Sequence, residues 1–147
     1  MKKIYVLFLA LSLNVYAHDE GHGPKLTDAP KMGGVVASVV LAKEASKGSK
    51  AELLYKGELA RTSDGSVRIY YYDKDMNKID LAAFSEKASA EVITSRRGKV
   101  ETQTFELVKH GDHYMGKMPT PARKPFNIDV KTKSADKELL VAFDNLD

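Results

Sequence analysis

The sequence predicts an all-β fold, an antiparallel sandwich of seven or eight strands in one domain. Short segments alternate apolar and polar side chains, as strands with one buried face do. Turn-forming residues recur about every 8 to 12 residues, and only residues 81–87 have a weak helical pattern, enough for a single turn. These features are typical of an immunoglobulin-like sandwich, with a closed barrel as the alternative, because periodicity does not show whether a sheet closes.

The first two strands are expected at 35–42 and 50–61. The first is rich in β-branched residues and begins directly after Gly33 and Gly34, where a polar segment ends. The second alternates leucine and tyrosine with glutamate and lysine, and the turn sequence Ser63-Asp64-Gly65 follows it. Both segments therefore predict strands with one face toward a core.

The strongest strand is predicted at 67–73. Its side chains divide into Val67, Ile69 and Tyr71 toward the core, and Arg68, Tyr70 and Tyr72 on the opposite face. The outer aromatic rings could stack on a sugar or a peptide, or pack beneath another layer of the protein. The remaining strands are expected at 88–94, 99–110, 113–118, 126–130 and 139–143.

Residues 1–17 have the pattern of a signal peptide. Lys2 and Lys3 precede an apolar run, and Val15-Tyr16-Ala17 fits a cleavage site, so we expect the mature chain to begin at His18. The apolar run is shorter than the roughly 18 to 20 residues that span a bilayer, so no membrane insertion is expected after cleavage. The chain has no cysteine, hence no disulfide, which fits export to a bacterial periplasm.

We divide the mature chain into a flexible, histidine-containing tail at 18–32 and the β-domain at 33–147. Loss of Lys2 and Lys3 with the leader leaves 21 basic against 20 acidic residues, and the net charge falls from +3 to +1. Such an even mixture predicts no basic stripe for nucleic acid and no polybasic patch for anionic lipid.

The first candidate metal site is the expected mature terminus. His18 could chelate a copper ion through its own amine and imidazole, with His22 or a nearby carboxylate as a further ligand. Amine and imidazole nitrogens favour copper, nickel or zinc over magnesium or calcium. The alternative is a solvated tail whose two histidines bind nothing.

The second candidate is a hairpin around Gly111 and Asp112, which suit a two-residue type II′ turn with glycine at its first central position. His110 and His113 would then face each other across two strands, and Met115 would share their face. Two imidazoles and a thioether suit copper, with zinc as the alternative, and binding should weaken below about pH 6, where imidazoles protonate. The competing interpretation is an ordinary solvated loop tip.

The sharper hypothesis joins the two candidates. If the tail folds over the hairpin, His18 or His22 would add to the ligands His110, His113 and Met115. This would complete a coordination shell that neither pair of histidines supplies alone.

Two other functions lack the residues they need. The segment Asp73-x-Asp75-x-Asn77 copies the start of a calcium loop, but Lys78 and Phe84 stand where glycine and glutamate are required, so a polar turn is expected. The sequence has no cysteine nucleophile, no Gly-x-Ser-x-Gly elbow and no phosphate-binding glycine loop, and we predict no enzyme.

Several segments resemble small exported bacterial proteins and the N-terminal stretches of periplasmic adaptor subunits of heavy-metal efflux systems. They are His18 to Gly23, Lys31 to Val36, Glu52 to Tyr55, Val67 to Asp73 and Ala88 to Val92. Where such proteins often have His-Gly-Gly, this chain has Met32-Gly33-Gly34. The resemblance implies metal handling, and it implies no catalytic residue.

We therefore expect a periplasmic protein that binds copper, in metal handling or as an accessory to an efflux system. The alternative is a non-catalytic envelope module that meets a protein or glycan partner through a sheet face or an edge strand.

Overall fold

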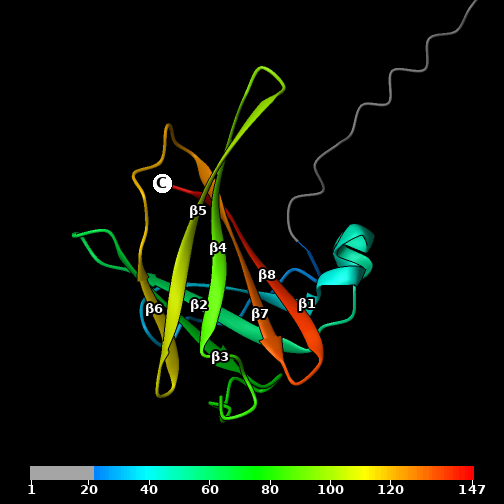
Figure 1. Ribbon diagram of the computed structural model, residues 1–147. Coiled ribbons are helices and arrows are strands. Elements are labelled where there is room, and N and C mark those ends of the chain that lie inside the picture. Colours follow the sequence, from blue (N-terminus) through cyan, green and yellow to red (C-terminus); the bar gives the residue numbers. More distant parts are fainter. Residues whose placement is uncertain (1–21) are drawn as a thin grey trace, which may run out of the picture.

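The computed structural model describes residues 22–147, and the expected signal peptide and His18 lie outside this range. It confirms an all-β, antiparallel fold of eight strands (Figure 1). The strands are β1 (Val35–Leu41), β2 (Tyr55–Arg61), β3 (Ser66–Tyr72), β4 (Lys87–Arg96), β5 (Lys99–His110), β6 (His113–Lys117), β7 (Phe126–Ser134) and β8 (Lys137–Leu146).

The strands form one closed barrel in the order β1-β2-β3-β6-β5-β4-β7-β8. Closure occurs where β1 pairs with β8, through Val39 with Val141, Val40 with Leu140 and Leu41 with Leu139. The predicted immunoglobulin-like sandwich of two sheets is thus not confirmed, and the structure is the barrel that the sequence left as the alternative. Closure depends on pairing between the first and the last strand, which alternation within either strand cannot reveal.

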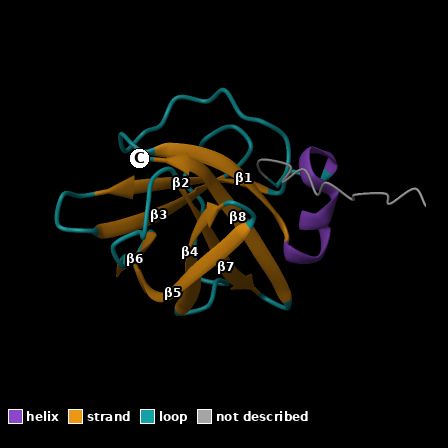
Figure 2. Cartoon of the chain, turned by 90° about the horizontal axis from the view of Figure 1, so that it is seen from above, coloured by secondary structure: helices purple, strands orange, loops and turns teal. Residues whose placement is uncertain are grey.

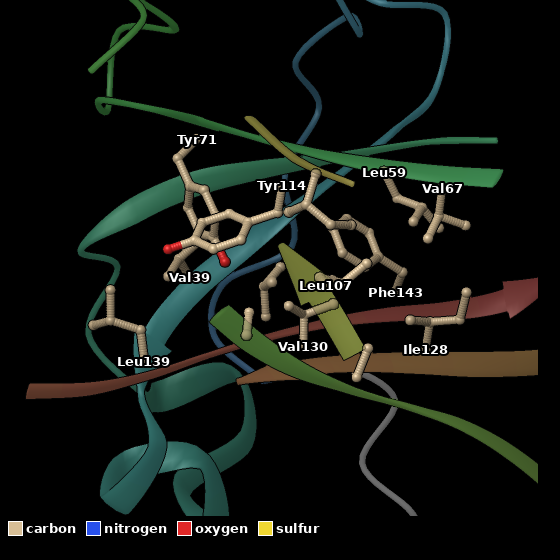
Figure 3. Close-up of a cluster of buried hydrophobic side chains, with 14 of the residues drawn as sticks. Val39, Leu59, Val67, Tyr71, Leu107, Tyr114, Ile128, Val130, Leu139 and Phe143 are labelled. Carbon is tan, nitrogen blue, oxygen red and sulfur yellow. The ribbon is translucent and has the colours of Figure 1, made fainter. Parts of the chain in front are cut away.

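The side chains that the alternating pattern predicted to point inward fill the interior of the barrel (Figure 3). From β3, the core cluster contains Val67, Ile69 and Tyr71, as expected. The hydroxyl of Tyr71 lies 2.6 Å from that of Thr132, and burial raises the pKa of Tyr71. The interior is therefore a packed core, with its few polar groups hydrogen-bonded.

One connection between strands is a helix where a loop was expected. Residues predicted as a loop at 43–49 form a 3-10 helix, η1 (Ala42–Lys50), which lies outside the barrel beside β1 and β8 (Figure 2). Residues 81–87 contain the single turn that was predicted, closed by a 2.9 Å hydrogen bond from Phe84 N to Leu81 O. No helix among residues 22–147 is long and apolar enough to cross a membrane.

Residues 22–34, most of which were predicted to belong to a flexible tail, follow the outer wall of the barrel. Ser38 Oγ donates a 2.5 Å hydrogen bond to Pro24 O, and Lys56 forms a 2.8 Å ion pair with Asp28. We call residues 22–34 the N-terminal strap, because these contacts attach the segment to β1 and β2.

Glu58 on β2 accepts three hydrogen bonds from the strap. Its carboxylate is fully buried and accepts hydrogen bonds from the backbone N–H groups of Lys31, Met32 and Gly34 and from the Tyr72 hydroxyl. Four donors compensate the loss of hydration that a buried carboxylate suffers. The strap therefore supplies the donors that allow this charge to be buried.

Candidate functional site

The predicted hairpin exists in the predicted register. His110 of β5 faces His113 of β6, and Val108 faces Met115. Gly111 has a φ of 64°, while Asp112 has no positive φ, as a type II′ turn requires. The turn chemistry that could be recognised in the sequence thus places the two imidazoles opposite each other.

The two imidazole rings are stacked at the outer end of the hairpin. Their centroids lie 6.4 Å apart with an angle of 28° between the ring planes. His110 is exposed and His113 is half-buried, because the ring of Tyr70 packs 5.1 Å from it. Both rings are open to a small ligand from the outside of the barrel.

Asp112 orients one of the two histidines. Its Oδ1 atom lies 2.8 Å from Nδ1 of His113, and its Oδ2 atom accepts a 2.8 Å hydrogen bond from Lys78 Nζ. These two hydrogen bonds, that of His113 first, lower the pKa of Asp112 to about 2. A carboxylate that accepts a hydrogen bond from Nδ1–H leaves Nε2 as the free acceptor, the arrangement common for metal-binding histidines.

Met115 lies two residues after His113 on the same outer face of β6, and it is half-buried. Arg68 of β3 pairs with Met115, and Lys78 contacts Asp112. Asp112 balances the charge of Lys78, so Arg68 is the cation that disfavours a divalent ion beside Met115 more than a monovalent one. The arrangement of two imidazoles and a thioether therefore suits copper in its lower charge state best.

His22 is not part of this group. Its Nδ1 atom lies 2.8 Å from Ala45 O of η1, and its charge acts on Asp129 of β7. The helix η1 contacts β1 and β8, which lie opposite β5 and β6 in the ring of strands, and Figure 1 shows η1 far from the hairpin turn. The structure thus brings together His110, His113 and Met115, and it places His22 on another wall.

Within residues 22–147, no three side chains among histidine, cysteine, aspartate and glutamate converge closely enough to hold a metal ion. The hairpin provides two such ligands beside Met115. The joint site that includes the tail rests on His18, which lies outside the described residues.

The outer tyrosine face is covered. Tyr70 and Tyr72 are buried with Met76, and Val36 and Ala60 pack against them. Burial, together with the hydrogen bond to Glu58, raises the pKa of Tyr72. An aromatic surface around Tyr70 and Tyr72 is therefore not available for stacking on a sugar or peptide, and only Arg68 of the predicted trio is exposed.

The calcium-like segment is a turn, as predicted. Asp73 Oδ1 accepts hydrogen bonds of 2.9 Å from the backbone N–H groups of Asp75 and Asn77. The hydrogen bond from Asn77 contributes most to a lowered pKa of Asp73. The carboxylate is thus occupied in closing the turn.

The long arm made by β4 and β5 was not predicted from the sequence. β6 pairs with β5 only from Val108 to His110, and its Gly116 still lies against Glu106 and Leu107, so within residues 22–147 Lys99 to Phe105 pair with β4 alone. Strand lengths could have indicated the arm, because the segment expected at 99–110 is longer than the one expected at 113–118.

A cavity of about 600 Å³ lies against β4, β5 and β7 and includes Lys87, Glu106 and Lys131 among its lining residues. It contains none of the predicted metal ligands. Comparisons with protein-family models, with curated proteins and with solved structures found no match to this chain.

Proposed function

We propose that this chain is an exported periplasmic protein that binds copper at the β5–β6 hairpin, in metal handling or as an accessory to an efflux system. The observation that carries the proposal is the stacked pair of His110 and His113 across the turn, 6.4 Å between centroids. A small rotation of both side chains would direct two imidazole nitrogens at one ion, with Met115 as a soft third ligand.

The hydrogen bond from His113 to Asp112 supports this proposal further. It fixes the ring and makes Nε2 the acceptor before metal arrives, which reduces the ordering cost of binding. A site with only two or three ligands, of which His110 is exposed, would release its ion readily, which suits transfer of copper better than catalysis. Zinc is the alternative ion, because imidazole also binds zinc.

The test is a competition titration with Cu(I) and a chromophoric chelator. We expect one copper ion to bind per chain, and His110→Ala with His113→Ala to reduce the affinity at least tenfold. The matched control is His22→Ala, which removes one imidazole from the opposite wall and should leave the affinity unchanged. Equal affinity in the parent and the double variant would reject the hairpin as the site.

A second candidate function, an envelope interaction module, is favoured by the free edge of β5. From Lys99 to Phe105 this strand pairs only with β4 within residues 22–147, and an extended segment of a protein partner could add along it. A photo-crosslinking residue at Gln103 on the edge should give a discrete adduct in intact cells. The same residue at Ser46 on η1 is the control, and identical adducts from both positions would count against an edge partner.

A further inference from the structure

The far end of the β4–β5 arm projects beyond the rest of the barrel (Figure 1). β7 pairs with β4 only up to Ile93, so the arm beyond that residue is a two-stranded ribbon. Its two-residue turn, Arg97 and Gly98, has positive φ values of 49° and 76°, as a type I′ turn requires. The arm therefore presents its tip as a defined structure.

Four basic side chains lie together at the tip of the arm. Arg96, Arg97 and Lys99 from the turn and Arg123 from the loop between β6 and β7 line one cavity of about 330 Å³, together with Glu101. The overall balance of charges does not extend to this surface, because three basic residues are neighbours in the sequence at the turn and the fold adds Arg123 to them.

These cations have no partners among residues 22–147. None of the four forms an ion pair within 4.0 Å of a carboxylate oxygen. Arg96 and Lys99 also pair directly across the two strands, and like charges in that position repel each other. The free protein thus maintains four cations around a cavity that Glu101 also lines, an excess of positive charge that an anionic ligand would stabilise.

We propose that the tip of the β4–β5 arm binds the phosphate groups of lipid headgroups on an anionic membrane surface. Guanidinium groups bind phosphate oxygens with two hydrogen bonds each, and three of the four cations are arginine. Arg96, Arg97 and Lys99 are exposed, so a single dissolved phosphate would gain little from any one of them.

A membrane surface differs because it offers many phosphates at once to a projecting tip. Each cation near an anionic surface increases the partition coefficient of the protein onto the membrane about fivefold, and these factors multiply. Val100, beside the turn, is 49% exposed and adds an apolar side chain that can enter the headgroup layer. The tip therefore fits a surface of phosphate headgroups better than a free anion.

The test is sedimentation of the purified protein with vesicles, either pure phosphatidylcholine or phosphatidylcholine with phosphatidylglycerol. We expect binding only to the anionic vesicles, and a loss of that binding in high salt. Arg96→Gln with Lys99→Gln should reduce partitioning about thirtyfold. Lys43→Gln with Lys50→Gln removes the same charge from exposed positions of η1 and is the matched control.

Three results would overturn the proposal. Equal partitioning of the arm variant and the η1 control would show that net charge alone drives association. Release of the protein from vesicles by millimolar inorganic phosphate at constant ionic strength would assign the tip to a free anion. Binding to duplex DNA at least as tight as to anionic vesicles, lost in the arm variant, would assign it to nucleic acid.

Discussion

Glu58 shows how a single residue organises the outer wall of the barrel. A glutamate that alternates with leucine and tyrosine in the sequence suggests a solvated position, yet its carboxylate is fully buried beneath the strap. The sequence could predict which way Glu58 points, because strand alternation is local. It could not predict that the strap covers this side chain, because the three backbone donors come from residues 24 to 27 positions away.

Replacing Glu58 by glutamine should destabilise the protein by about 2–4 kcal/mol, because an amide nitrogen would meet donors where the carboxylate accepts. Urea unfolding measures the change. Glu52→Gln, at an exposed position, is the control and should alter the free energy of unfolding by less than about 0.5 kcal/mol. A Glu58 variant as stable as this control would contradict the role of the carboxylate in fixing the strap.

Asp129 gives a prediction about pH. Burial is the main cause that raises its pKa, Asp144 and Glu91 add to it, and His22 opposes it. An acid with a raised pKa in the folded state binds protons more tightly there. Its contribution to stability is therefore complete below the unfolded value of about 3.9, and it is lost as the pH rises through the folded pKa.

Asp129→Asn should accordingly melt at a higher temperature than the parent at pH 7, and the advantage should vanish near pH 3, because both side chains are then neutral. Thermal unfolding at the two pH values measures this. Asp136→Asn, at an exposed site, should show no such dependence. An advantage of equal size at both pH values would show that ionisation of Asp129 is not its cause.

Among the elements, the β5–β6 hairpin could be predicted best from sequence. Two-residue turns have strict backbone requirements, and glycine at the first central position satisfies them locally. The arm formed by β4 and β5 was not predicted, because its separation from β6 depends on how strands of unequal length pair. The residues of the turn were thus enough to predict the histidine pair, whereas the arm depends on which strands pair around the barrel.

The register of the hairpin gives the third prediction. A glycine inserted between Gly111 and Asp112 would lengthen the loop, so that His110 and His113 would no longer face each other. The affinity for Cu(I) should fall at least tenfold while the circular dichroism spectrum stays that of the parent. A glycine inserted between Arg97 and Gly98, at the other turn of β5, is the control, and an equal loss of affinity in both would exclude the pairing as the cause.

For the whole molecule, closure of the sheet determines which predicted ligands can meet. Because β1 and β8 close the barrel on the side opposite to β5 and β6, His22 lies away from the hairpin, and Tyr70 and Tyr72 lie beneath other segments. Alternation predicted the strands and their faces, since both depend on neighbouring residues. It could not predict the strand order or the covering of a face, since both depend on contacts between distant parts of the chain.

The most direct test of copper binding at the hairpin is nitrogen-15 NMR of the imidazole rings during titration with Cu(I). If copper binds at the hairpin, Nε2 of His113 and one ring nitrogen of His110 should shift together and saturate at one equivalent, while the resonances of His22 stay unchanged. Shifts confined to His22, or no shift in His110 and His113 at saturating copper, would contradict it.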